Sequence, residues 1–163
     1  MKKRIIILLC FFSILSCSHY NEYGRKRVNF NLERIKPNSD PKAFTIIDTT
    51  KLYKKVAMVT PENIRPEFAK VRLEYLKFYN NGRVGKFDSI DFDIIESFNP
   101  KNAESYLYQY KNNELVVQIY FTHVQCGQCF IKERLKKVSN DTIQLLSDGY
   151  IDTYVAVDIP KSF

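Results

Sequence analysis

From Ala43 onward, short apolar and aromatic stretches alternate with polar turn residues. Leu52–Val59 is a candidate strand. The clearest pattern spans Leu73–Phe87, where two alternating stretches flank the Asn-Asn-Gly sequence at 80–82. Asn-Gly supplies the positive φ angles that tight hairpins require. The pattern therefore predicts a β-hairpin.

The same arrangement recurs where Tyr106–Tyr110 and Leu115–Phe121 flank a second Asn-Asn turn. Further candidate strands are Thr45–Ile47, Ile90–Ile95, Thr142–Leu146, Tyr150–Ile151 and Tyr154–Ile159. Phe130–Val138 is ambiguous, because its apolar residues also suit one face of a helix. The frequent turns predict a mainly β fold: an antiparallel meander forming a small barrel or half-barrel.

The first apolar run, Ile5–Leu15, follows three basic residues and is too short to span a bilayer, which takes about 20 residues. A short apolar core behind a basic start is typical of a secretory signal. It ends in Ile14-Leu15-Ser16-Cys17, which resembles the lipobox of bacterial lipoproteins. That resemblance implies cleavage after Ser16, diacylglycerol on the Cys17 sulfur and acylation of the new amino terminus. The alternative is an ordinary signal peptide or an uncleaved anchor.

Two or three acyl chains anchor a protein stably to a membrane. Residue 18 is Ser. In lipoproteins of this kind Asp at this position favours retention in the inner membrane, so the resemblance implies an outer-membrane anchor, with the domain facing the periplasm.

The chain accordingly divides into a signal peptide (1–16), a lipidated N-terminus with a disordered tether (17–42) and a β-rich domain (43–163). Three of the positive charges in the net +7 lie in the signal, and residues 43–163 carry only +1. Nucleic-acid binding is not expected, because it requires a basic patch on the folded domain. Arg25-Lys26-Arg27 could contact anionic head groups or belong to a solvated tether.

The hairpin 75–84, the Tyr-rich stretch, the apolar stretch after it and Asp141-Thr142-Ile143 together resemble lipocalin-like bacterial lipoproteins over about residues 45–160. The resemblance implies an up-and-down meander that holds an apolar ligand. The chain departs from the lipocalin pattern because it has no Trp and so lacks the Gly-x-Trp hallmark.

Cys126-Gly127-Gln128-Cys129 is the one motif with evident chemistry. In an oxidising envelope these two thiols have each other as partners once Cys17 is lipidated, so we expect a structural disulfide. The alternative is thiol–disulfide redox activity, because the order strand, Cys-x-x-Cys, possible helix resembles a thioredoxin-like site. A metal site is not expected, since only His123 lies nearby and zinc needs four ligands.

No phosphate loop, nucleophile elbow or catalytic carboxylate pair is present, and no cofactor is expected. In the acidic stretch Asp88–Glu96 a calcium loop is disfavoured because no Gly stands at the bend. The alternating tyrosines of the predicted strands could form a stacking surface or half-buried packing. The sequence thus predicts a non-enzymatic envelope lipoprotein that binds an apolar ligand or an envelope protein. Its alternative is a lipid-anchored redox protein.

Overall fold

The computed structural model describes residues 18–22, 25–28, 35–60, 71–124 and 127–159. Its strands are β1 (Ser18–Tyr20), β2 (Lys26–Val28), β3 (Leu52–Val59), β4 (Tyr75–Phe78), β5 (Arg83–Phe87), β6 (Glu104–Lys111), β7 (Glu114–His123), β8 (Gly127–Lys137), β9 (Thr142–Ser147) and β10 (Tyr150–Val157). Its 3₁₀ turns are η2 (Pro41–Thr45), η4 (Ile95–Phe98) and η5 (Pro100–Asn102).

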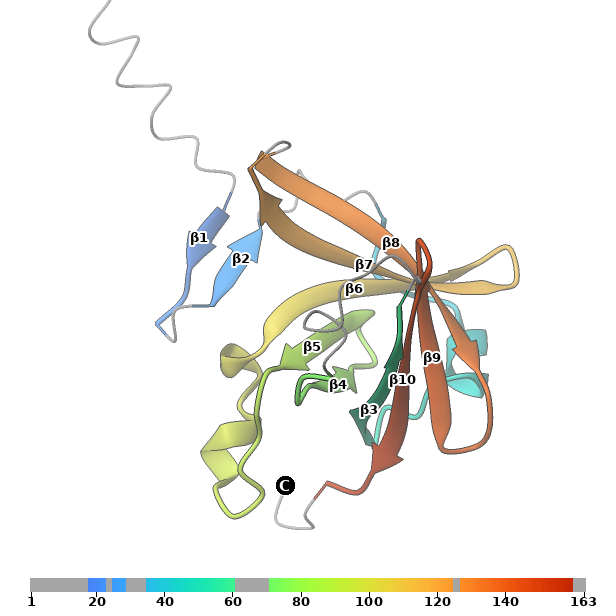
Figure 1. Ribbon diagram of the computed structural model, residues 1–163, viewed down its shortest axis with the longest axis horizontal. Coiled ribbons are helices and arrows are strands. Elements are labelled where there is room, and N and C mark those ends of the chain that lie inside the picture. The colour runs from blue at the N-terminus through green and yellow to red at the C-terminus, as the bar shows by residue number, and fades with distance from the viewer. Residues whose placement is uncertain (1–17, 23–24, 29–34, 61–70, 125–126, 160–163) are drawn as a thin grey trace, which may run out of the picture.

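Strands β3 to β10 form one closed antiparallel barrel (Figure 1). Each strand pairs with its neighbour in the chain, and β10 closes the barrel by pairing with β3. Closure leaves the sheet without a free edge, which removes the aggregation hazard of an open sheet. The predicted antiparallel meander is confirmed, and of the two shapes expected the protein adopts the barrel.

Local turn chemistry sets the register of the predicted hairpins. Gly82 has φ 79°, so it takes the left-handed conformation that the β4–β5 turn needs. Asn112 and Asn113 both have positive φ, at 53° and 62°, and join β6 to β7 as a two-residue turn. Asn tolerates this conformation better than most residues with a side chain, which explains the Asn-Asn sequence there.

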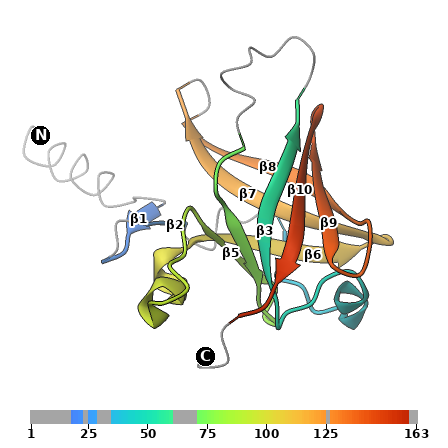
Figure 2. The same cartoon turned by 60° about the horizontal axis from the view of Figure 1, so that its bottom comes forward.

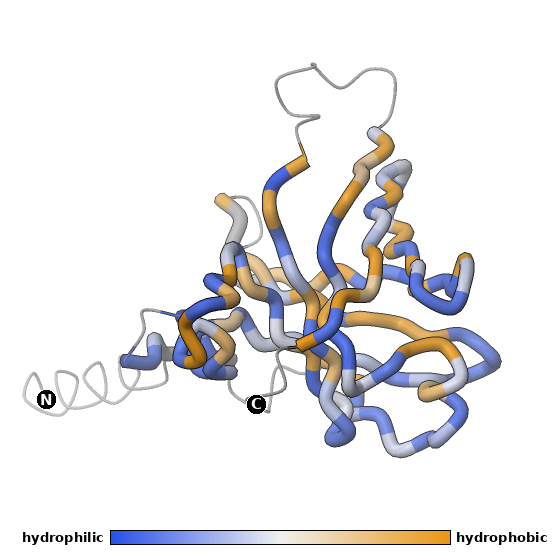
Figure 3. Tube along the Cα trace, turned by 90° about the horizontal axis from the view of Figure 1, so that it is seen from below, coloured by the Kyte–Doolittle hydropathy of each residue, from blue (hydrophilic) through white to orange (hydrophobic). Residues whose placement is uncertain are grey.

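The main core fills the half of the barrel nearest these two turns, which we call the capped end. Its largest fully buried members are aromatic, and Phe78 packs edge-on against Tyr53 and Tyr108 at ring-centroid distances of 5.6 Å. Edge-to-face pairs of this kind stabilise a core beyond their area burial. Hydrophilic and hydrophobic residues interleave along the strands, as a barrel with one buried face requires (Figure 3).

The segment before β3 covers the capped end. Ala43 and Ile47 join the main core, and the buried Asn38 accepts a hydrogen bond from the Tyr110 backbone N–H at 2.9 Å. Strand β5 ends its pairing with β6 at Leu107, so Asn38 replaces a missing strand neighbour for Tyr110. Ile35, at the start of this segment, is also buried.

A second, smaller core lies on the outer wall, where the β5–β6 connection folds back over the barrel. Its buried members are Leu52, Tyr75, Phe87, Ile90, Phe98 and Ala103. This connection contains η4 and η5 and no strand, so the predicted strand at Ile90–Ile95 is wrong: Ile90 is buried, whereas Ile94 and Ile95 are exposed.

Strands β1 and β2 form a separate two-stranded sheet outside the barrel, beside the β5–β6 connection (Figure 2). Arg25 pairs with Asp88 at 2.6 Å, and the Asn21 side chain donates to the Lys101 carbonyl at 2.6 Å. The described residues 18–22 and 25–28 thus form a paired sheet that contacts the β5–β6 connection.

Three other interpretations of the sequence are corrected or resolved by the structure. Thr45–Ile47 is not a strand, because Asp40 caps a 3₁₀ turn over Pro41–Thr45 by accepting from the Lys42 N–H. Phe130–Val138, which the sequence left open between helix and strand, is strand up to Lys137, because these residues belong to β8, which pairs with β7 and β9. The two short C-terminal candidates are one strand, β10.

Among the described residues no helix is long and apolar enough to cross a membrane.

Candidate functional site

Beyond the main core, toward the end of the barrel opposite the capped end, the inward positions of the strands carry charges. We call this group the inner belt: Lys55, Glu74, Lys86, Glu104, Glu133 and Asp152, with the hydroxyls of Tyr106 and Tyr154.

Strand periodicity explains why these side chains face inward. Residues two apart share a face of a sheet, and the core residues Val84 and Leu135 mark the inward phase of β5 and β8. Lys86 and Glu133 stand two positions from them. By the same spacing Tyr53, Leu76, Tyr106 and Tyr154 fix the phase of the other four belt residues.

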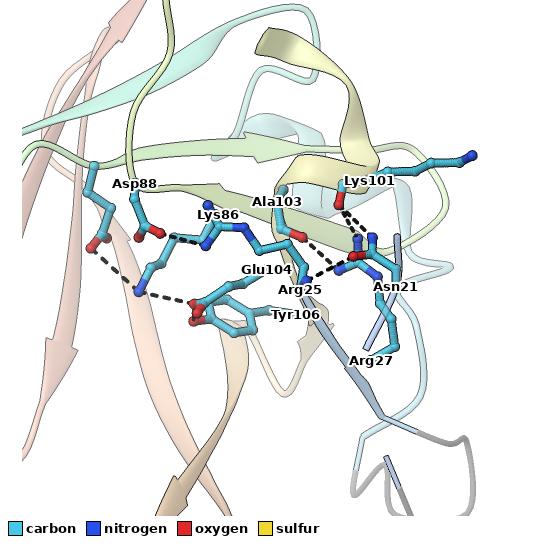
Figure 4. Close-up of polar contacts among 10 residues, drawn as sticks. Asn21, Arg25, Arg27, Lys86, Asp88, Lys101, Ala103, Glu104 and Tyr106 are labelled. Carbon is cyan, nitrogen blue, oxygen red and sulfur yellow. Dashed lines mark hydrogen bonds and ion pairs between the residues drawn. The ribbon is translucent and has the colours of Figure 1, made fainter. Parts of the chain in front are cut away.

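Lys86 holds one side of the belt together. Its Nζ lies 3.2 Å from Glu104 Oε2 and 3.8 Å from Glu74 Oε2. The Tyr106 hydroxyl donates to the same Glu104 oxygen at 2.5 Å, and the Lys86 ammonium stands 5.9 Å from the centre of the Tyr106 ring (Figure 4). Although burial acts to lower the pKa of Lys86, Glu74 and Glu104 raise it, so its ammonium stays charged.

Lys55 forms the second ion pair, with Asp152 Oδ2 at 2.5 Å, and its side chain is only 8% exposed. The Tyr154 hydroxyl donates to Glu74, and the Lys55 ammonium stands 5.9 Å from the centre of the Tyr154 ring, so Tyr154 links the two ion pairs. Burial and then the nearby carboxylates raise the pKa of both Tyr106 and Tyr154 far above the usual range. Both phenols therefore remain protonated donors at any physiological pH.

Glu133 is the half-buried member of the belt that has no ion-pair partner among the described residues. Burial, followed by the charges of Asp152 and Glu74, raises its pKa to about 7, despite the opposing influence of Lys55 and Lys86. No described residue donates a hydrogen bond to its carboxylate, and Oδ1 of Asp152 is buried without a donor within the same residues. Four carboxyl groups thus share two ammonium groups, and the belt has unused capacity for a cation or a proton.

The structure describes only some of the site residues predicted from the sequence. Cys129 lies on β8 opposite Phe121 of β7 and is partly buried, whereas Cys17 and Cys126 lie outside the described residues. The helix that a thioredoxin-like site would place after the cysteines does not form, because Gly127–Lys137 is strand. The Cys126–Cys129 disulfide itself stays a prediction. His123 lies at the end of β7, paired with Gly127.

The tyrosine stripe proves to be packing more than an exposed surface. Tyr75, Tyr106 and Tyr108 are buried, and Tyr79, Tyr110 and Tyr120 are half-buried. Within the described ranges no group of three His, Cys, Asp or Glu residues is arranged to hold a metal ion.

Sequence reasoning missed the inner belt. Its only signal is a charged residue two positions from a core residue within a strand, such as Lys86 after Val84 or Asp152 before Tyr154. A scan against protein-family models and searches of curated proteins and of solved structures found no match to this chain.

Proposed function

We propose that this chain is a lipid-anchored binding protein of the bacterial envelope, whose barrel holds a small amphiphilic ligand with a cationic group at the inner belt. The observation that carries the proposal is the surplus of carboxyl groups, with Glu133 accepting no hydrogen bond from a described residue. A carboxyl group that is partly removed from water destabilises a protein unless it is paired, so Glu133, on the inward phase of the barrel and without an ion-pair partner among the described residues, favours a binding role.

Apolar residues beyond the belt suit the rest of such a ligand. Ile119 of β7 stands opposite Ile131 of β8 on the inward phase, and Phe121, two residues further, is exposed. An amine would meet the carboxyl groups while a hydrocarbon part lies against these residues. The apolar ligand implied by the lipocalin-like resemblance thus becomes an amphiphile.

The test is a comparison of a short, soluble alkylamine with the alcohol of the same chain length, using the full-length protein and thermal unfolding. A ligand that binds only the folded protein raises its melting temperature. We expect the amine to raise it more than the alcohol does, and Glu133→Gln to reduce the amine's effect. Glu114→Gln, at an exposed carboxylate of β7, is the matched control. Equal shifts from amine and alcohol, or an unchanged response of Glu133→Gln, would contradict the proposal.

Anchoring is tested separately, in cells supplied with a fatty-acid analogue. The lipobox predicts that the wild-type chain is labelled and Cys17→Ala is not. Equal labelling of both would refute the lipid anchor while leaving the barrel's binding role open.

A further inference from the structure

A recess lies on the outer wall of the barrel, where the β1–β2 sheet faces strands β5, β6 and β7. Arg27, Arg83, Ser105, Gln118, Tyr120 and Phe130 are among the residues that line it. A neighbouring recess shares the first three of these residues and extends to Lys101. Two belt residues reach these recesses, Tyr106 in the first and Glu104 in the second. Arg83, Ser105 and Gln118 lie on the opposite, outward phase of their strands from the core residues Val84, Tyr106 and Val117.

Register brings the recess residues of the barrel together. Arg83 stands opposite Leu107, and Leu107 opposite Gln118, so the three form one row across β5, β6 and β7. Ser105, two residues before Leu107, lies on the same face, and the Arg83 guanidinium donates to its hydroxyl at 3.5 Å.

Arg27 completes the recess from the N-terminal sheet. Its guanidinium donates to the carbonyls of Ala103, at 2.6 Å, and Lys101, at 3.0 Å (Figure 4). These acceptors are neutral, and no carboxylate of the described residues forms an ion pair with Arg27. Burial lowers its pKa, as do the charges of Arg25 and Arg83, so positive charge is concentrated here.

Gln118 is the second and independent sign of a ligand. The residue is only 3% exposed, its side chain lines the recess, and its Oε1 has no hydrogen-bond donor within the described residues. Leaving a buried amide unpaired costs about 1–3 kcal/mol, so a leucine would suit this wall position better in the absence of a ligand. Oε1 is an acceptor, so it suits a hydroxyl of hydrogen phosphate or of a head group, while the NH₂ group of the same carboxamide would donate to an anionic oxygen.

We propose that this recess binds a phosphate group. Two guanidinium groups, the Ser105 hydroxyl and the Gln118 amide supply several donors in one recess, which suits an anion with several oxygens. The group could belong to free phosphate or to a phospholipid. Arg27 pairs in register with His19, two residues from Cys17, so lipidation of Cys17 would hold the recess close to head groups.

The test uses isothermal titration calorimetry on the full-length protein in a nonionic detergent and a phosphate-free buffer. The two probes are inorganic phosphate and a short-chain phosphatidylglycerol. The recess variants are Arg83→Gln and Gln118→Leu, and Arg134→Gln, at a guanidinium whose side chain is 68% exposed on β8, is the control. Arg27 is left intact, because it also fastens the N-terminal sheet.

We expect wild type to bind at least one probe and each recess variant to bind it about tenfold more weakly or worse, as the loss of one charge-assisted hydrogen bond implies, with Arg134→Gln unchanged. Tighter binding of phosphatidylglycerol assigns the site to lipid, and tighter binding of phosphate assigns it to the free anion. Gln118→Leu should also melt above wild type in the phosphate-free buffer.

Absence of binding of both probes to wild type would overturn the proposal, as would recess variants that bind like wild type. A Gln118→Leu protein that melts below wild type would show that the carboxamide is structural, and would overturn its assigned role. None of these outcomes depends on whether the barrel interior binds an amine.

Discussion

Glu133 is the residue whose protonation should control the pH dependence of stability. Its carboxyl group has an ordinary pKa of 4.5 in the unfolded chain and about 7 in the barrel. Between these two values the folded protein holds a proton that the unfolded chain has already lost. Stability therefore falls as pH rises through this window and levels off above pH 7.

The magnitude follows from the shift. One pKa unit corresponds to about 1.36 kcal/mol, so a rise from 4.5 to about 7 implies a loss of up to about 3 kcal/mol. Relaxation of the belt and water entering it would reduce this figure. The groups that set the shift are Asp152 and Glu74, which raise the pKa, and Lys55 and Lys86, which lower it.

The assay is urea unfolding of wild type and Glu133→Gln at a series of pH values from 4 to 9. The difference between the two free energies of unfolding is the useful quantity, because His19 and His123, common to both proteins, cancel. Between pH 4.5 and 7 we expect wild type to lose about 1–3 kcal/mol of its free energy of unfolding relative to Glu133→Gln. Above pH 7 the difference between the two proteins should stay constant.

Glu114→Gln is the control, since Glu114 is exposed and begins β7 beside the Asn112-Asn113 turn at the capped end, opposite the end toward which the belt lies. A difference between wild type and Glu133→Gln that does not change with pH would refute the raised pKa of Glu133. So would a difference that changes in favour of wild type as pH rises.

Three further outcomes test the capped end and the cysteines. Gly82→Ala should lose at least about 1–2 kcal/mol in denaturant unfolding, because φ is positive and a Cβ would stand 2.1 Å from the Asn38 nitrogen; Gly149→Ala, at an exposed glycine with φ 85°, should lose less. Asn38→Ala should cost about 1–3 kcal/mol and speed hydrogen exchange of the Tyr110 amide, and unchanged exchange would disprove that bond. Protein isolated from the envelope should show no free thiol at Cys126 and Cys129. The variant with both cysteines replaced by Ser should lose less than about 3 kcal/mol of its free energy of unfolding, because the closed loop is short. Insulin reduction that depends on both thiols would favour the redox alternative.

The hairpins could be predicted from sequence because their information is local. Asn-Asn-Gly at 80–82 and Asn112-Asn113 specify turns within a few residues, and the alternation on either side specifies strands. Strand β8 is different. Ile131 and Leu135 are four residues apart, a spacing that suits both a helix face and one face of a strand. Only pairing with β7 and β9, which lies outside the segment, decides between them.

The segment 35–47 could not be predicted for a related reason. Ile46 and Ile47 favour strand by composition, yet the closed barrel offers no free edge to pair with. Its capped end needs a cover, which Ala43 and Ile47 provide, and an acceptor for Tyr110, which Asn38 provides. Polar residues that look like a linker are thus used to satisfy the backbone of the barrel.

The inner belt escaped prediction because the two faces of a strand are equivalent until the barrel closes. From sequence alone, Lys86 of β5 would be assigned to the solvent-facing side of the strand. Because Val84, two positions before it, is buried in the core, both side chains point inward. A domain selected only for stability would carry apolar residues at such positions, because replacing buried ion pairs by well-packed apolar residues is often neutral or stabilising. The belt spans five strands and the residue before β4, so its charges require a collective explanation, and recognition of a charged ligand provides one. The pH dependence of Glu133→Gln bears directly on this argument, since a belt that serves recognition must keep at least one carboxyl group available.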